Sequence, residues 1–211
     1  MVSRSRAPED EGQNRDRAQV LTLEAVSAGI LLLLAVGFAL QMTAVTPLSA
    51  STSSQHLENQ LRFTGSGVLA NTAETGALSG AIRYWNDSNA RFFDAPDGGY
   101  YTNTPPDNAL GDAFNRTFDE RNVAYNVVLI YEKSGGATIR KRMLYRGEPT
   151  DHAVRATWTV TIMEGDPLID EDGSVNKSVT VSDAKTYLLP DAEPGRPVRN
   201  VVRVEVVAWR I

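Results

Sequence analysis

The feature that most limits how this chain can fold is an uninterrupted apolar run near its N-terminus. Residues 25–45 contain no charged side chain and include four consecutive leucines, Leu31–Leu34. At about 1.5 Å per residue, a helix of this length spans about 31 Å, which matches the hydrocarbon core of a bilayer. The whole chain is only 42% hydrophobic, so a buried position for such a helix in a soluble core is unfavourable. We therefore expect a transmembrane and assembly helix over residues 19–45.

A cleaved secretory signal is the alternative for this segment. Such a signal has an apolar region of about 7–15 residues behind a purely basic stretch. Here the apolar run is longer, and basic and acidic side chains are mixed before it: Arg4, Arg6, Arg15 and Arg17 with Glu9, Asp10, Glu11 and Asp16. The small residues at 47–51 leave a weak cleavage site, so this alternative stays open.

The basic residues that flank the run predict its orientation. Arg15 and Arg17 lie just before it, whereas the first basic residue after it is Arg62. Basic residues next to a span stay on the cytoplasmic side. We therefore expect a single-pass protein of the cell membrane, with a cytoplasmic N-terminus and an extracellular C-terminal domain.

One acidic residue, Glu24, directly adjoins the apolar run. A carboxylate costs about 2.5–3.5 kcal/mol at the bilayer centre on insertion scales and much less at the interface. The stretch RAQVLTLEA, residues 17–25, resembles the processing and assembly signal of type IV pilins and pseudopilins, especially of pilin-like surface proteins of haloarchaea. The resemblance implies that a prepilin peptidase recognises Arg17 and Ala18 and cuts between Ala18 and Gln19, and that Glu24 aids assembly.

The resemblance also implies a structural role. The stretch at residues 41–60 is similar to members of a haloarchaeal pilin-like group of unknown function, so the likeness covers about the first third of the chain. It differs from the common bacterial pattern because Glu24 would be the sixth residue after cleavage and Gln19 replaces the usual phenylalanine. The partners implied are membrane lipid, the prepilin peptidase and other pilin-like subunits, and no cofactor is implied.

The remaining chain predicts a helix followed by a sheet. Apolar residues recur at multiples of four between Leu57 and Ala81, which predicts a helix that glycines could interrupt. Residues 86–107 are rich in loop-forming residues, and a short helix is expected at 108–119. Alternating side chains then predict strands at 123–132, 138–145, 154–162, 179–188 and 198–209, with a hairpin at Gly135 and Gly136.

These elements give an α+β fold, in which a long N-terminal hydrophobic transmembrane helix is followed by a pilin-like antiparallel β-sheet domain. The sheet is expected to have four or five strands and to lie against the N-terminal helix. We divide the chain into a cytoplasmic leader (1–18), cleaved if the resemblance holds, the transmembrane helix (19–45), a helical stalk (46–83) and an extracellular sheet domain (84–211).

Candidate sites in the outer domain are sparse. The chain has no cysteine, which excludes thiol chemistry. It has only two histidines, too few for a histidine-rich metal site. We expect surface or capping roles for both histidines. The acidic stretches at 170–176 and 94–99 lack the full calcium-loop pattern and are interpreted as turns. The basic cluster at 140–146 alternates between two strand faces and is interpreted as a solvated edge. Three candidate glycosylation sequons occur, at Asn86, Asn115 and Asn176.

Net charge and composition narrow the range of functions that we expect for this chain. The net charge is −5, which opposes nucleic-acid binding. We expect a non-catalytic, membrane-anchored, pilin-like surface protein that is a structural or minor component of a type IV pilus-like or secretion-type assembly. The alternative is an unprocessed single-pass surface protein whose outer domain binds a ligand or partner. A membrane-tethered hydrolase is a third class, disfavoured because no nucleophile, base and orienting group can be assembled from this inventory.

Overall fold

A computed structural model describes the backbone of residues 9–211 and the side chains of residues 17–41 and 54–211. The first eight residues of the predicted leader lie outside the described residues. The chain divides into two compact units, residues 1–53 and residues 54–211. The first unit contains most of helix α1, Glu9–Glu74, which ends in the second unit. α1 is helical through Pro47, although proline ordinarily ends or kinks a helix.

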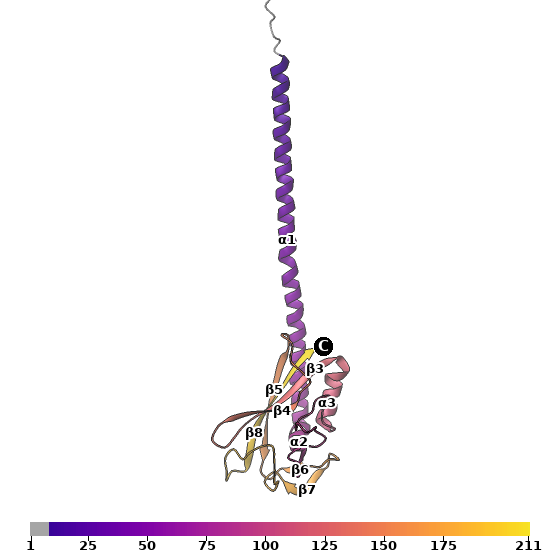
Figure 1. Cartoon of the computed structure of the whole chain (residues 1–211), viewed down its shortest axis with the longest axis vertical. Coiled ribbons are helices and arrows are strands. Elements are labelled where there is room, and N and C mark those ends of the chain that lie inside the picture. The colour runs from indigo at the N-terminus through magenta and orange to yellow at the C-terminus, as the bar shows by residue number, and fades with distance from the viewer. Residues whose placement is uncertain (1–8) are drawn as a thin grey trace, which may run out of the picture. The chain divides into compact units, whose positions relative to one another are not determined.

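The second unit follows the predicted order of a helical segment and then a sheet (Figure 1). After α1, its elements are α2 (Ala77–Arg83), β1 (Trp85–Asn86), β2 (Arg91–Phe92), α3 (Ala109–Thr117), the 3₁₀ turn η1 (Asp119–Arg121), β3 (Val123–Glu132), β4 (Thr138–Leu144), β5 (Val154–Met163), β6 (Pro167–Ile169), β7 (Val175–Thr180) and β8 (Val198–Arg210). The predicted α+β class, with a long apolar N-terminal helix and an antiparallel sheet, is therefore confirmed.

The main sheet has four antiparallel strands in the order β4-β3-β8-β5. Consecutive strands β3 and β4 are joined at Gly135 and Gly136, which both have positive φ, so the predicted hairpin is confirmed. β8, the last strand, lies between β3 and β5 and contributes 13 residues. The chain thus closes its fold by inserting its C-terminal strand into the middle of the sheet.

One face of this sheet packs against the helices. Val68 and Leu69 of α1, with Leu78 and Ile82 of α2, belong to the same buried cluster as the core-facing residues of β3, β5 and β8. Figure 1 shows α1, α2 and α3 on one side of the strands. The approach of α1 is close, because a Cβ on Gly65 would lie 3.1 Å from the Cβ of Ala156. The prediction that the sheet lies against the helix is confirmed.

Local signals account for the helix boundaries. Gly76 adopts a left-handed conformation with φ of 77° between α1 and α2, as glycine does at low cost. α3 begins after Asn108, whose side-chain oxygen accepts hydrogen bonds from the backbone N–H groups of Leu110 and Gly111, each at 3.1 Å. The expected helix at 108–119 is thus present as Ala109–Thr117.

The strand predicted at 179–188 is wrong. β7 ends at Thr180, and residues 181–188 form turns and irregular structure. The side chain of Asp183 accepts hydrogen bonds from the backbone N–H of Thr180 at 3.1 Å and from its hydroxyl at 2.6 Å. Such local side-chain to backbone bonding competes with strand pairing, and it turns the chain just where the alternating pattern suggested continuation.

Candidate functional site

The predicted processing and assembly residues lie on one exposed stretch of α1. Arg17, Ala18, Gln19 and Glu24 are all helical and exposed in the described structure. Arg17 and Glu24 are seven positions apart, which places them on nearly the same face, two turns from each other. The carboxylate of Glu24 makes no ion pair within the described side chains.

This stretch begins a segment with the properties of a membrane span. An 18-residue window within Arg17–Gln41 has a mean hydropathy of 2.3, and none of that window is buried inside the described structure. The hydroxyl of Thr22 donates to the carbonyl oxygens of Ala18 and Gln19, at 3.0 and 2.8 Å, which satisfies a polar group without water. Length and composition are the grounds for a membrane anchor here, and a signal sequence near an N-terminus would meet the same criteria.

The basic cluster at 140–146 divides into separate contacts. β4 is an edge strand of the sheet, and Arg140 pairs with Glu205 of β8 at 2.6 Å. The guanidinium of Arg142 lies 4.2 Å from the ring centroid of Tyr145. The interpretation of this cluster as a solvated strand edge is confirmed for Arg140 and Arg142, whose side chains are exposed and share one strand face.

Arg146 instead belongs to a half-buried polar centre. It binds Asp119 through both terminal guanidinium nitrogens, Nη1 and Nη2, a bidentate geometry that fixes both side chains. Its guanidinium also stacks 4.4 Å from the ring centroid of the fully buried Tyr125. Burial, the largest single influence, lowers the pKa of Arg146, but the hydrogen bond to Asp119, the charge of Asp119 and the neighbouring Tyr125 together outweigh it and raise that pKa. Burial likewise raises the pKa of the Tyr125 hydroxyl. Both side chains therefore keep their ordinary charge states.

A polar hollow of about 420 Å³ opens beside this pair. Its lining is mostly carboxylates, amides and prolines: Asn103, Thr104, Pro105, Pro106, Asp107, Asp112, Asn115, Asp119 and Arg146. Such a lining suits hydrogen bonding to water or to the hydroxyl groups of a ligand. It contains no histidine or lysine that could act as a general base.

A hydrogen bond between two side chains links α1 to the loop before β5. Nδ1 of His152 lies 2.9 Å from Oε1 of Glu58, at the side of a cleft of about 310 Å³ that Leu57, Leu61 and Arg210 also line. The expected surface role of His152 is confirmed, since 74% of its side chain is exposed. Its carboxylate partner lies 94 positions earlier, so no sequence spacing signals the pair.

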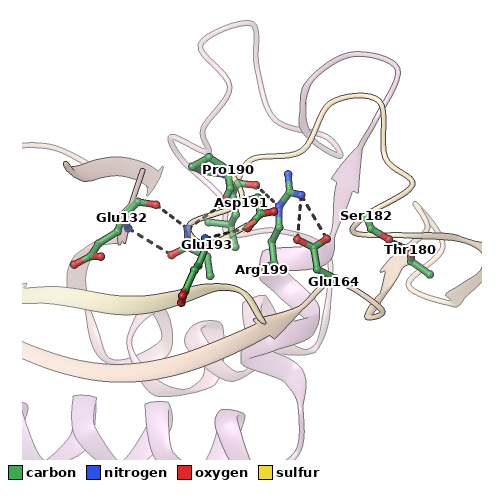
Figure 2. Close-up of polar contacts among 10 residues, drawn as sticks. Glu132, Glu164, Thr180, Ser182, Pro190, Asp191, Glu193 and Arg199 are labelled. Atoms are coloured by element: carbon green, nitrogen blue, oxygen red, sulfur yellow. Dashed lines mark hydrogen bonds and ion pairs between the residues drawn. The ribbon is translucent and has the colours of Figure 1, made fainter. Parts of the chain in front are cut away.

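The segment 181–197, which we call the strap, is held to β8 by polar contacts (Figure 2). The amide nitrogen of the buried Asn200 donates to the carbonyl oxygens of Glu132 and Pro190, at 2.7 and 3.0 Å. Arg199 donates to the carbonyl of Leu189 at 2.9 Å and pairs with Glu164 at 3.3 Å. These contacts satisfy the polar groups of β8 that lie under the strap, so they stabilise the fold.

The remaining candidate residues lie apart from one another. The acidic stretch at 170–176 is the turn of the β6–β7 hairpin, as interpreted, and no group of three or more His, Asp or Glu that could hold a metal occurs within the described residues. Asn86 begins a turn by accepting from the N–H of Asn89 at 3.0 Å. Asn176 bonds Asp170 at 2.8 Å, whereas Asn115 is exposed on α3.

A comparison with protein-family models assigns the chain to a family. The model of a family of unknown function, DUF7288, matches residues 17–208, so the chain belongs to that family. No curated protein and no solved structure matches it. The matched region begins at Arg17 and therefore includes both the apolar segment and the sheet domain.

Proposed function

We propose that this DUF7288 chain is a non-catalytic surface protein, anchored in the membrane by the N-terminal part of α1 and assembled with other subunits as type IV pilin-like proteins are. The observation that carries the proposal is the division of α1. Its segment Arg17–Gln41 is apolar and wholly exposed. Val68 and Leu69, in contrast, are buried in the core of the second unit, residues 54–211, which we call the outer unit.

An exposed apolar helix needs a partner. Large side chains of this segment, such as Leu33 and Phe38, have exposed fractions of 72% and 66%. Exposing that much apolar area to water is unfavourable at about 25 cal/mol per Å². Lipid can cover these side chains, and so can the helices of neighbouring subunits.

Glu24 gives the proposed assembly its specificity. If the chain is cut after Ala18, the new amine of Gln19 carries a positive charge at neutral pH. That amine in one subunit can pair with the Glu24 carboxylate of the next, which relieves the cost of placing either charge near lipid. A plain anchor would leave Glu24 at the headgroups with no partner requirement.

The outer unit supports the absence of catalysis in this proposal. Within the described residues, the imidazole of His56 makes no hydrogen bond and that of His152 bonds only the carboxylate of Glu58. A nucleophile activated by a histidine base requires a direct hydrogen bond between the two. Neither histidine is placed for that role.

Mass spectrometry and one substitution test the proposal. Protein taken from its native membrane should begin at Gln19, and Glu24→Gln should leave the protein in the membrane while removing it from any larger assembly. Glu74→Gln, which changes an exposed glutamate at the other end of the same helix, is the matched control and should assemble normally. A mature chain that begins near Met1, with Glu24→Gln assembling like the wild type, would reduce the function to a simple anchor.

Topology is tested separately. We expect residues 46–211 to lie outside the cell, because basic residues flank only the N-terminal end of the apolar segment. An epitope placed after Ile211 should be removed when protease is added to intact cells. Protection of that epitope would contradict the orientation and leave the question of cleavage to the mass measurement.

A further inference from the structure

The charges of the outer unit are segregated between two regions. The four strands of the main sheet carry seven basic and two acidic side chains, a net charge of +5. Residues 164–197, which comprise the β6–β7 hairpin and the strap, carry eight acidic and three basic side chains, a net charge of −5. The net charge of the whole chain is also −5, so its overall acidity conceals a basic surface.

Four of these seven basic residues, Arg140, Arg142, Arg155 and Arg203, lie with Glu132 and Glu205 on the face of the sheet that the helices leave uncovered. Because Ile130 pairs with both Arg140 and Arg203, these two arginines stand on one face, two strands apart. Arg142 and Arg155 lie on the same face by alternation. The core-facing residues of these strands point the other way, toward α1 and α2. We call this exposed arginine-bearing surface the outer sheet face.

Two arginines of the outer sheet face have no partner within the described side chains. Arg140 pairs with Glu205, and Arg142 stacks on Tyr145. Arg155 and Arg203 are exposed and make no hydrogen bond, ion pair or ring contact. The hydroxyl-bearing residues Thr157 and Thr159 lie beside them on β5 and face the same way. This surface is exposed, positively charged and able to form further hydrogen bonds.

The acidic region ends in an exposed turn. Glu171 and Asp172, at the tip of the β6–β7 hairpin, are exposed and make no ion pair. Hydrogen bonds from Ser174 lower the pKa of Asp172, so this carboxylate is charged at neutral pH. No ion pair joins the hairpin tip to the outer sheet face within the same chain.

We infer that the outer sheet face of one copy of this chain docks the acidic β6–β7 hairpin tip of a second copy. The opposite charges of the two surfaces are the basis for choosing a second copy as the partner: the four arginines, Glu132 and Glu205 of the outer sheet face give a net charge of +2, and residues 170–174 give −3. Because the two surfaces differ, the contact is heterologous, and repeating it gives either a closed ring or an open-ended row of subunits. The inference rests on the proposed function and names the contact between its outer units.

The physical role of this contact is to orient neighbouring subunits relative to one another. Exposed ion pairs are individually weak, but complementary fields steer two surfaces together and disfavour wrong registers. Subunits held in one membrane by their helices are already concentrated, so weak outer contacts suffice to align them.

Cysteine cross-linking tests the geometry, because the chain contains no native cysteine. Thr159→Cys, which lies opposite Arg203 on the outer sheet face, and Val175→Cys, which is 52% exposed beside the hairpin turn, are placed in two differently tagged full-length copies in the same membrane. Oxidation should join the two copies, and neither variant should join to itself to a similar extent. Ser66→Cys on the exposed side of α1 replaces Thr159→Cys in the control and should not cross-link. Equal cross-linking of the control, or none in either pair, would overturn the inference.

Charge reversal tests the chemistry. Arg155→Glu with Arg203→Glu should lower the cross-linked yield about tenfold, and Glu171→Lys with Asp172→Lys in the partner copy should restore most of it. Arg116→Glu with Arg121→Glu makes the same change in net charge on exposed positions of α3 and η1 and should have no effect. An unchanged yield after reversal, or no recovery with the reversed partner, would refute the contact.

Two checks keep the outcomes separable. Fluorescence of the buried Trp85 and Trp209 reports whether a reversed chain is folded, and the milder Arg203→Gln should give an intermediate yield. If Glu24→Gln abolishes assembly while charge reversal does not alter the cross-link, only the present inference fails. If Glu24→Gln has no effect on assembly, the proposed function fails whatever the outer contact does.

Discussion

A single methyl group at Gly111 should destabilise the outer unit strongly. Gly111 is buried in the first turn of α3, and a Cβ built there would lie 1.8 Å from the carbonyl oxygen of Pro106 and 3.0 Å from its carbonyl carbon. Non-bonded heavy atoms in contact lie roughly 3.5 Å apart. Gly111→Ala therefore requires the backbone of the 105–107 loop and α3 to separate by about 1.5 Å or more.

The magnitude follows from opposing effects. Alanine is favoured over glycine in a helix interior by about 1 kcal/mol. Forcing a methyl group into a packed site costs up to about 3 kcal/mol, and displacing α3 also weakens the two hydrogen bonds that the Asn108 side chain accepts, a cap worth about 1 kcal/mol. We expect Gly111→Ala to lower the free energy of unfolding by about 3 kcal/mol.

Gly67→Ala is the matched control, because the same methyl group on α1 would meet nothing within 4 Å. It should raise the free energy of unfolding by up to about 1 kcal/mol. All three tryptophans, Trp85, Trp158 and Trp209, lie in residues 54–211. Urea unfolding of the full chain in mild detergent, followed by tryptophan fluorescence, therefore reports this unit. If Gly111→Ala unfolds at the wild-type urea midpoint, the close packing of the loop on α3 is refuted.

Three further perturbations test other contacts of the outer unit. Asn200→Leu leaves the carbonyl groups of Glu132 and Pro190 without their donor, so the free energy of unfolding should fall by about 2–3 kcal/mol, and mass spectrometry should find faster protease cleavage within residues 181–197. Asp119→Asn removes the charge partner of the half-buried Arg146 and should cost about 1–2 kcal/mol in the same urea assay, less than a fully buried pair would. Burial raises the pKa of the Tyr101 hydroxyl above its ordinary value of 10.0. Its contribution to stability is therefore complete below pH 10 and is lost as the pH rises further, and the part of the tyrosinate absorbance at 295 nm that Tyr101→Phe removes should appear together with unfolding.

The main sheet could be predicted from the sequence because its alternation is strong and one-sided. On β5, Val154, Ala156 and Ile162 are buried, and the residues between them are mostly exposed. A period of two places such residues on one face of a strand whatever the partner. The glycine pair of the β3–β4 hairpin adds the turn that fixes which strands are neighbours. Composition and period therefore sufficed to predict the strands and the layer they form.

Contacts between residues far apart in the sequence could not be predicted in this way. Arg146 was assigned to a basic cluster from its neighbours, whereas its partner Asp119 lies 27 positions earlier. The error at 179–188 has the same origin at short range, because the bonds from Thr180 to Asp183 override an apolar pattern. Sequence patterns show which face of a strand or helix a side chain occupies. The residue that the fold brings against that face can be identified only from the structure.

The two contacts that we propose act in different solvents and would support each other. Near lipid, the low dielectric makes the pairing of Glu24 with a neighbouring amine strong once formed but leaves little to distinguish one rotation of the helix from another. In water, the exposed arginines Arg155 and Arg203 add little energy but require a specific placement of the next subunit. Because both contacts belong to the same chain, pairing near the membrane holds the outer surfaces of two subunits at a high local concentration. A weak outer contact can then form. We therefore expect Glu24→Gln to abolish the proposed assembly and the reversal of Arg155 and Arg203 to produce assemblies that still form but are irregular, a difference that electron microscopy of membranes containing each variant would reveal.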